Sequence, residues 1–300
     1  MKLGELFERG RFVITSEAGP PKGTDIQEMM EGVELLRHRV DAFNVTDQQS
    51  SVMRLGSLAV SALLKQRGIE PIFQTTCRDR NRIALQSDLL SAYVLGIENV
   101  LCLTGDYVSL GDHPDAKPVF DLDSVSLLFT ASRLQEGYDL AGQELRGKPE
   151  FYVGAVVNPG ANPLEPQIIK MEKKIEAGAQ FFQTQAVYEP EKFAAFMKQV
   201  EGFGVPVMVG IILLKSAGMA RFMNRNVAGI HVPDHLIAEM EEAKDRGKTS
   251  VEIAGRLIRE MKSLCQGVHI MALGWEKHVS AVLDAAGLER LQDILERGGG

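Results

Sequence analysis

Short apolar, β-branched runs alternate along the chain with longer segments whose apolar residues recur at helical spacing. The runs predict eight strands, at about 12–17, 41–46, 70–76, 99–104, 151–157, 181–185, 205–211 and 267–273. Several of the intervening helical segments close with a glycine before the next strand, which is the usual position of a helix C-cap. Continuous apolar strands that alternate with amphipathic helices favour a parallel sheet covered by helices.

Eight such units match a closed (β/α)₈ barrel better than an open Rossmann sheet. No GxGxxG motif follows the first predicted strand, which argues further against the Rossmann alternative. We therefore predict an α/β protein, a (β/α)₈ TIM barrel in which residues 1–300 form a single domain. The connections at 106–150 and 212–250 are too long for plain loops and predict insertions after the fourth and seventh strands.

Composition and charge narrow the class of protein. The net charge of −7 argues against general binding to nucleic acid, which needs clustered positive charge. The three cysteines, Cys77, Cys102 and Cys265, are far apart in sequence and odd in number, and their spacing resembles neither a disulfide framework nor a CxxC metal pair. The six histidines have no metal-ligand spacing at a strand end. We predict no metal. Without a signal-like start or an apolar run of about 20 residues, we expect a cytoplasmic protein that does not cross a membrane.

Polar residues gather at the carboxyl ends of the predicted strands, where barrel enzymes carry their catalytic groups. A polar residue that ends a single strand is usually a helix cap or a turn residue. The crowding of so many at one end nevertheless predicts a site. These positions hold Glu17, Thr46, Asp47, Gln74 to Cys77, Gly105, Asp106, Asn158, Gln185 and Lys215.

Three of these residues suggest specific chemistry. Glu17 ends the first strand, and a carboxylic acid facing an apolar barrel mouth has its pKa raised by desolvation, which suits a proton donor; a surface salt bridge or a helix cap is the alternative. Asp106 follows Gly105 and could project over the mouth or cap a helix. The amide of Gln185 offers both a donor and an acceptor to the edge of a heterocycle.

Basic residues near the strand ends leave two interpretations open. Arg78, Arg80 and Arg82 could bind a phosphate or carboxylate, or could form a solvated, salt-bridged helix face. Lys215 follows the seventh strand, and a desolvated lysine there would suit a Schiff-base aldolase.

Five segments, in order on successive strand ends, carry a resemblance to a known family. They are SEAGPP at 16–21, NVTD at 44–47, TTC at 75–77, LTGD at 103–106 and KKIEAGAQFFQTQAVYE at 173–189. These resemble FEFFPP, SVTYG, HLTC, LRGD and KVDAGADFIITQFFFD of the methylenetetrahydrofolate reductase family. The resemblance extends over nearly the whole chain.

The resemblance implies a flavin, FAD or alternatively FMN, across the barrel mouth, and a hydride passed from flavin N5 to the methylene carbon of 5,10-methylenetetrahydrofolate. It implies that Glu17 is the acid that opens the folate ring, that Asp106 lies near flavin N1 and the pterin, and that Gln185 and Phe222 contact the substrate. The positions matching flavin-binding residues are Thr46, Gln74, Thr76, Thr104, Gly105, Asp106, Asn158, Gln167, Lys174 and Ala179.

The chain also departs from the family pattern around the flavin. Gln74 replaces a histidine, Thr104 an arginine, Asn158 a tyrosine and Gln167 an aspartate, and Phe222 matches the family phenylalanine only to within one position. These changes leave open FAD against FMN, and direct use of NAD(P)H against electrons from a partner. The pattern is similar to acetogen-type reductases that work with an iron–sulfur and zinc-binding partner subunit, so we expect an oligomer or a hetero-complex.

Two other functions remain as alternatives. One is a non-redox folate-binding or methyltransferase-type barrel, and the other is the Schiff-base aldolase built on Lys215. A yellow purified protein would argue against both.

Overall fold

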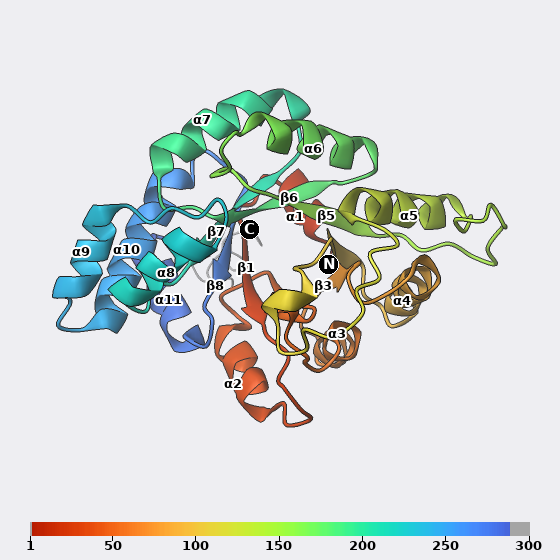
Figure 1. Ribbon diagram of the computed structural model, residues 1–300, viewed down its shortest axis with the longest axis horizontal. Coiled ribbons are helices and arrows are strands. Elements are labelled where there is room, and N and C mark those ends of the chain that lie inside the picture. Colours follow the sequence, from red (N-terminus) through yellow and green to blue (C-terminus); the bar gives the residue numbers. More distant parts are fainter. Residues whose placement is uncertain (1, 289–300) are drawn as a thin grey trace, which may run out of the picture.

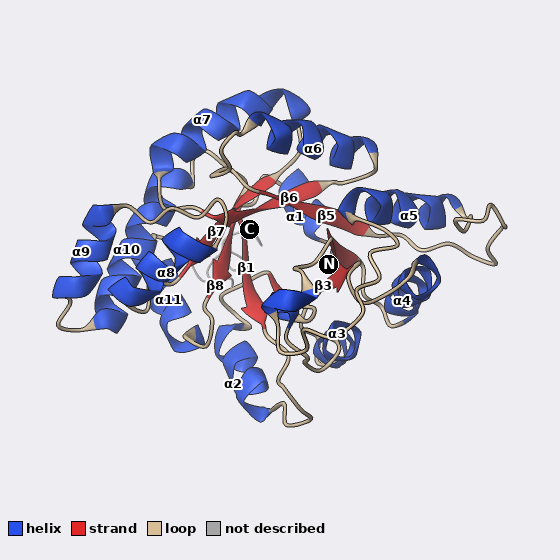
Figure 2. Ribbon diagram, viewed as in Figure 1, coloured by secondary structure: helices blue, strands red, loops and turns tan. Residues whose placement is uncertain are grey.

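The structure, a computed structural model that describes residues 2–288, is built around eight parallel strands that close into a barrel. Each strand pairs with the next in the sequence, and β8 pairs with β1 to complete the ring (Figure 2). The strands are β1 (Val13–Ala18), β2 (Ala42–Val45), β3 (Pro71–Thr76), β4 (Asn99–Leu103), β5 (Tyr152–Val157), β6 (Phe181–Ala186), β7 (Val207–Ile212) and β8 (Gly267–Met271). The predicted (β/α)₈ barrel is confirmed, with strand bounds shifted by one or two residues.

Helices surround the barrel and cover the outer face of every strand (Figure 1). They are α1 (Leu3–Glu8), α2 (Gln27–Leu36), α3 (Ser57–Gln66), α4 (Arg82–Val94), α5 (Ser124–Glu136), α6 (Glu165–Glu176), α7 (Pro190–Val200), α8 (Ala217–Asn226), α9 (Asp234–Glu242), α10 (Arg246–Met261) and α11 (Glu276–Ala285). Three short 3₁₀ helices are η1 (Gln49–Ser51), η2 (Val108–Leu110) and η3 (Glu201–Phe203). The predicted domain spans 1–300, so Met1 and residues 289–300 of it lie outside the described part of the chain.

Both predicted insertions are present. The connection from β4 to β5 contains η2 and α5, and the connection from β7 to β8 contains α8, α9 and α10. Local signals define their helices: Asp123 caps α5 by accepting a hydrogen bond from the Ser126 N–H at 2.8 Å, and Gly137 ends the helix with a φ of 98°.

The interior of the barrel is apolar at its amino-terminal end and becomes polar toward its carboxyl end. At the amino-terminal end, α1 packs across the opening, and a small cluster that includes Leu3, Phe181 and Met208 fills the space with apolar side chains. The ring of Phe181 stacks on that of Tyr152 with 5.3 Å between centroids. This end is a packed core, as expected for the interior of a small barrel.

Halfway up the barrel lies a layer of buried polar side chains, which we call the polar layer: Thr15, Asn44, Gln183 and His269. Buried polar groups are costly unless they are hydrogen-bonded. Here the amides of Asn44 and Gln183 bond to each other reciprocally, with Asn44 Nδ2 to Gln183 Oε1 at 2.7 Å and Gln183 Nε2 to Asn44 Oδ1 at 3.1 Å. The polar layer therefore separates the apolar end from the mouth, where the candidate site lies.

Candidate active site

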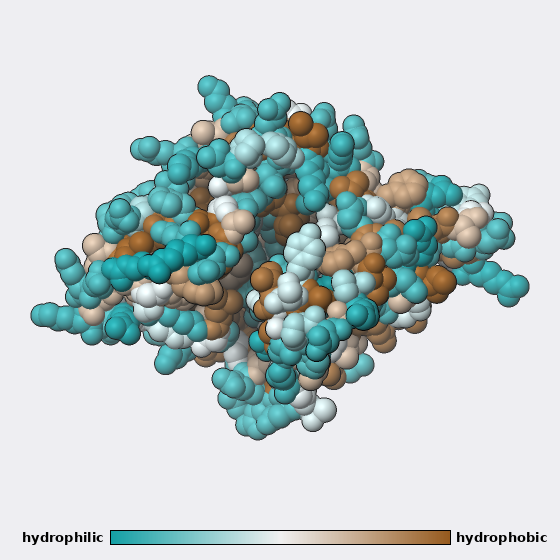
Figure 3. Space-filling view, in the orientation of Figure 1, coloured by the Kyte–Doolittle hydropathy of each residue, from teal (hydrophilic) through white to brown (hydrophobic). Residues whose placement is uncertain are grey.

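A cavity of about 440 Å³ opens at the carboxyl ends of the strands, within the size range of pockets that bind small molecules. The molecular surface is hollowed near the centre of the ring, and hydrophobic residues border the hollow (Figure 3). Of the residues that the family resemblance assigns to catalysis, substrate or flavin, all but Phe222 and Ala179 line this cavity. The lining residues are Glu17, Thr46, Gln74, Thr76, Thr104, Gly105, Asp106, Asn158, Gln167, Lys174 and Gln185.

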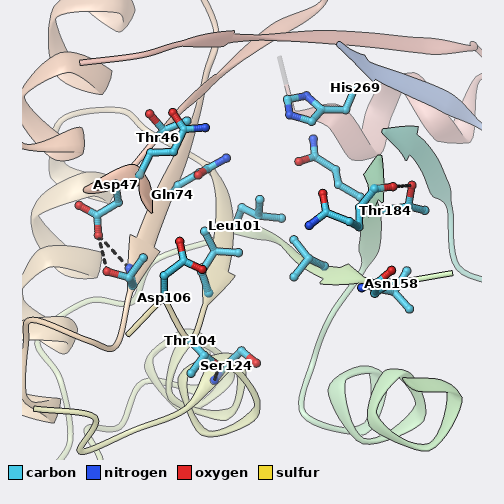
Figure 4. Close-up of a pocket in the computed structure, with 18 of the residues that line it drawn as sticks. Thr46, Asp47, Gln74, Leu101, Thr104, Asp106, Ser124, Asn158, Thr184 and His269 are labelled. Atoms are coloured by element: carbon cyan, nitrogen blue, oxygen red, sulfur yellow. Dashed lines mark hydrogen bonds between the residues drawn. The ribbon is translucent and has the colours of Figure 1, made fainter. Parts of the chain in front are cut away.

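The cavity has two facing walls. Thr46, Asp47 and Gln74 come from the ends of β2 and β3 and lie opposite Asn158 and Thr184, from β5 and β6 (Figure 4). Apolar side chains form part of the lining between these polar walls: Leu101, Leu103, Val156, Val157 and Met271. The site thus combines apolar side chains with polar groups from both walls.

Glu17 is a buried carboxyl group at the wall of the cavity. Its side chain is only 10% exposed, and the nearest basic atom, Nε2 of His269, lies 3.9 Å from Oε1. Burial, reinforced by the negative charge of Glu276, raises the pKa of Glu17 to about 7. A carboxyl group with this pKa is partly protonated at neutral pH and can donate a proton there.

Asp106 is placed by a tight turn and a buried arginine. Gly105 has a φ of 94°, and a Cβ there would lie 3.1 Å from the Cβ atoms of both Thr76 and Arg78. Arg78, which is 2% exposed, donates from Nη1 to the Asp106 carbonyl at 3.2 Å and from Nη2 to the Gln48 carbonyl at 3.3 Å. Arg78 thereby fixes the loops that follow β2 and β4 on one side of the mouth.

The remaining arginines are used in ion pairs. Arg80 makes two hydrogen bonds to the buried carboxylate of Asp47, at 2.7 and 3.1 Å, and a further ion pair to Asp88 at 3.0 Å. Arg82 pairs with Asp121 at 2.8 Å. Of the three predicted arginines, only Arg78 lines the cavity, and it too is in an ion pair, with Asp79 at 2.7 Å. The salt-bridged interpretation therefore holds for all three.

Thr46 offers a polar atom with nothing bound to it. Its Oγ1 is buried, and no residue in the described part of the chain hydrogen-bonds to it. The neighbouring Asp47 is saturated by contrast, because it accepts hydrogen bonds from the N–H and Oγ1 of Thr76 at 2.9 and 3.0 Å. A buried hydroxyl without a partner at a cavity wall is a position for a ligand atom.

Helix α6 contributes a basic stripe to the cavity. Gln167, Lys170 and Lys174 are spaced so that they share one face of the helix, and all three line the wall. Burial, with repulsion from Lys170, lowers the pKa of Lys174 to about 8, and its Nζ donates to the Val156 carbonyl at 2.6 Å. These amines suit an anionic group at the edge of the site.

Two amides at the site are already engaged by the backbone. Gln185 accepts a hydrogen bond from the N–H of Ala186 at 3.0 Å. Asn158 donates to the Ala228 carbonyl at 3.0 Å and accepts from the Gly160 N–H at 3.2 Å. Asn158 therefore joins the loop after β5 to the loop after α8, a role that sequence reasoning did not predict.

Three predicted residues lie away from the cavity. Ala179 is buried just before β6, at the amino-terminal end of that strand and therefore at the opposite end from the mouth. Phe222 is on α8 and is 60% exposed. Lys215, the basis of the aldolase alternative, donates to the Leu273 carbonyl and lies beside the ring of Trp275, so the lysines of the cavity wall are Lys170 and Lys174 instead.

Sequence reasoning missed His269 and Gln183, which both line the cavity. His269 lies between the apolar Val268 and Ile270 in β8, and an isolated polar residue in an apolar strand was the available signal. Gln183 is followed by the polar Thr184 and Gln185 in β6, so only the folded barrel reveals that its side chain points inward. Burial lowers the pKa of His269 to about 3, so its imidazole is neutral at physiological pH.

The described part of the chain contains neither a metal-binding cluster nor a membrane-spanning helix. No group of three or more histidine, cysteine, aspartate or glutamate side chains in that part of the chain could hold a metal ion. None of the helices that the structure describes has both the length and the apolar character needed to cross a membrane.

Comparison with known proteins identifies a consistent set of relatives. The sequence model of the family described as Methylenetetrahydrofolate reductase matches residues 2–287. "Methylenetetrahydrofolate reductase 2" of Schizosaccharomyces pombe is 26% identical over 96% of this chain and 48% of its own length. "5,10-methylenetetrahydrofolate reductase" of Pectobacterium carotovorum subsp. carotovorum is 27% identical over 69% of this chain and 64% of its own. This chain thus spans about half the length of several relatives that it matches.

A solved structure shares the fold. It is a Clostridium thermocellum protein described as binding two copies of 5-methyl-5,6,7,8-tetrahydrofolic acid, with a TM-score of 0.63 and 16% identity. The match covers 95% of this chain and 98% of that one. At this identity the likeness supports the barrel architecture.

Proposed function

Because this chain belongs to the methylenetetrahydrofolate reductase family, we propose that it reduces 5,10-methylenetetrahydrofolate to 5-methyltetrahydrofolate with the help of a bound flavin. The observation that carries the proposal is Glu17, a buried carboxyl group with a pKa of about 7 at the wall of the cavity. Asp106 and Gln185 line the same cavity, as the family resemblance requires of substrate-contacting residues. The names of the curated relatives describe the same reaction.

The cavity has features that fit a flavin. The apolar side chains of Leu101, Val156 and Met271 offer a surface for a flat ring system, and the unpartnered Oγ1 of Thr46 offers a hydrogen bond at its edge. At Gly105 a Cβ would crowd Thr76 and Arg78, so only glycine leaves the wall open there. Gln167, Lys170 and Lys174 would hold the polar and anionic parts of the cofactor. These residues suit both FMN and the flavin half of FAD.

The reaction needs a proton and a hydride. A bound flavin supplies the hydride, which no side chain of the site can provide. Glu17 donates its proton to the folate ring nitrogen whose bond to the methylene carbon breaks when the five-membered ring opens, and it is left as a carboxylate. Asp106 and Gln185 hold the pterin so that the methylene carbon faces the hydride donor, because reaction requires near-contact geometry.

The source of the electrons forms a separate part of the proposal. Gln74, Thr104, Asn158 and Gln167 replace the family residues around the flavin, and Phe222 lies outside the cavity. We propose that a redox partner subunit, rather than NAD(P)H alone, reduces the bound flavin. If the isolated chain oxidised NADH at full rate in the presence of the folate, this part would be wrong. The hetero-complex and the cytoplasmic location stay predictions.

The function is tested with the purified full chain. We expect a yellow protein whose flavin, reduced chemically with dithionite under anaerobic conditions, is reoxidised by 5,10-methylenetetrahydrofolate with formation of 5-methyltetrahydrofolate. Chemical reduction separates the folate half-reaction from the question of the electron donor. A colourless protein that takes up neither FMN nor FAD, or reduced flavin that the folate leaves unchanged, would contradict the proposal. Borohydride with substrate should trap no adduct on Lys215.

A further inference from the structure

His269 is a buried titratable group for which the proposed reaction has so far given no role. It lies on β8 at the wall of the cavity, its side chain is 5% exposed, and its Nε2 is 3.9 Å from Oε1 of Glu17. The other ring nitrogen, Nδ1, lies 3.0 Å from Oγ1 of Thr15. The imidazole therefore connects the polar layer to the acid.

The hydrogen bonds of the polar layer favour one tautomer of His269. The reciprocal amide pair with Asn44 directs Nε2 of Gln183, a donor, toward Oγ1 of Thr15 at 3.5 Å. The Thr15 hydroxyl accepts from Gln183 in this arrangement, and we take its proton to be donated to Nδ1 of His269, 3.0 Å away. A neutral imidazole has one donor and one acceptor nitrogen, so an accepting Nδ1 leaves the proton on Nε2.

The charged surroundings of Glu17 leave its carboxylate without a cation. His269 on β8 is neutral, and Glu276 at the start of α11 is a like charge that opposes ionisation. The other charged groups of the wall come from other elements: Asp47, Arg78 and Asp106 from the loops after β2, β3 and β4, and Lys170 and Lys174 from α6. None of these pairs with Glu17 in the described part of the chain. A carboxylate formed at this position needs a donor nearby.

We propose that neutral His269 is the positioning residue for Glu17, presenting its Nε2–H to the carboxylate that remains after the proton has moved to the substrate. The reaction that uses this proton rests on the proposed function, but the Glu17–His269 contact does not. A separation of 3.9 Å is too long for a hydrogen bond and shortens by about 1 Å when the bond forms. Catalytic hydrogen bonds are often long in the free enzyme and tighten in the complex.

A neutral imidazole serves this purpose better than a charged one. An imidazolium beside Glu17 would hold the carboxyl group ionised before the substrate arrives, and no proton would remain to donate. An N–H dipole stabilises the carboxylate only as it forms. Burial keeps the imidazole neutral, and the hydrogen bond to Thr15 orients its ring.

Nitrogen-15 NMR of the wild-type protein labelled at histidine tests the tautomer. The signal of His269 is assigned by its loss in His269→Gln. We expect a neutral ring with Nε2 protonated and Nδ1 unprotonated between pH 6 and 8. A ring protonated on Nδ1, or a ring charged in this pH range, would overturn the inference. No substrate is needed, so the result is independent of the reaction catalysed.

Variants test the link to Glu17, whose carboxyl titration is followed by infrared difference spectroscopy against Glu17→Gln. In His269→Leu we expect the pKa of Glu17 to rise by about one unit, because a donor to the carboxylate is lost, and folate reduction to fall on the order of tenfold. The pH at which reduction declines should move up together with the infrared titration. His269→Gln, which can place an amide N–H near the position of Nε2, should restore most of both values.

Thr15→Val and His235→Gln complete the series. Thr15→Val removes the partner of Nδ1 without touching His269, and we expect a mixture of tautomers with a smaller rise in the Glu17 pKa. His235 is exposed on α9, and its substitution should change nothing. A His269→Leu protein that folds and has an unshifted Glu17 titration would overturn the inference. Wild-type protein that shows the expected titration but no folate reduction would overturn only the proposed function.

Discussion

At its amino-terminal end the barrel interior is closed by α1 and filled by apolar side chains such as Leu3, Phe181 and Met208. At its carboxyl end an open cavity is lined by Glu17, by two lysines from α6 and by a Thr46 hydroxyl that has no hydrogen-bond partner among the described residues. The polar layer lies between them. One sheet therefore supports two environments that differ in polarity, in charge and in how tightly they are packed.

The two ends of the barrel contribute to the free energy of folding with opposite sign. Buried apolar side chains at the closed end stabilise the fold by removing surface from water. At the open end, Glu17 is buried without a cation, so its ionised form costs folding free energy. Groups held in unfavourable environments mark functional sites in general. We expect substitutions at the two ends to have opposite signatures.

The largest effect is expected at the open end. Glu17→Gln should lower folate reduction by roughly 10²–10⁴-fold, the usual worth of a general acid, while folate and flavin still bind. In the wild-type protein, kcat/KM should fall as the pH rises above about 7, because Glu17 loses its proton there. Rapid-reaction kinetics over this pH range provide the measurement. The exposed Glu28→Gln serves as the control, and an unimpaired Glu17→Gln enzyme would remove Glu17 from the role of acid.

A substitution at the closed end should affect stability instead. Phe181 is fully buried and stacked on Tyr152, so Phe181→Ala should lower the free energy of unfolding by about 3–5 kcal/mol. Chemical denaturation gives this value, with Phe129→Ala on the exposed face of α5 as the matched control. Folate reduction by the fraction that remains folded should be nearly unchanged. A destabilisation equal to that of Phe129→Ala would show that this end is not the packed core.

The third prediction concerns the effect of Glu17, a residue of the open end, on the stability of the fold. The folded protein keeps Glu17 protonated up to a pH of about 7, whereas the unfolded chain ionises it above about 4.5. Wild-type stability should therefore decline between these values, by about 3 kcal/mol, and Glu17→Gln should escape the decline. Unfolding free energies of both proteins at pH 4.5 and pH 8 test this, with Glu28→Gln for comparison. A difference that does not change with pH would contradict the raised pKa.

The smallest effect concerns the loop beyond β4. Asp106→Asn removes a negative charge at the cavity wall and should weaken folate binding about tenfold while raising the flavin reduction potential by about 30 mV. Titration with folate and spectroelectrochemistry measure the two changes. Asp115→Asn, exposed in the same loop, is the control. If only one of the two properties moved, Asp106 would not face both ligands.

Much of this architecture could be predicted from the pattern of residues. Continuous apolar strands that alternate with helices predict a parallel sheet with both faces buried, and eight such units without a GxGxxG motif favour the closed barrel over an open sheet. The same register places Glu17, Thr46 and Asp106 at the carboxyl ends of their strands, so their gathering around one cavity follows from the topology. Family resemblance added the reaction.

The rest required contacts between residues distant in sequence. The sequence left the roles of Arg78 and Arg80 open, and the fold places Arg78 between two loops and Arg80 on Asp47. It offered Lys215 as the basis of an aldolase alternative, yet the lysines that reach the cavity are Lys170 and Lys174, from a helix rather than a strand end. Local spacing does not reveal such contacts, because they depend on how the loops and helices pack.

The sequence by itself therefore determined the barrel, the end at which the candidate site lies and the position of Glu17 at that end, since all of these depend on periodicity and strand order. Only the tertiary structure decided the environment of that acid. His269 lies 252 positions from Glu17 in the chain, and the barrel brings them together where β8 pairs with β1. Burial and the like charge of Glu276 arise from that closure, and they set the pKa on which the proposed chemistry depends.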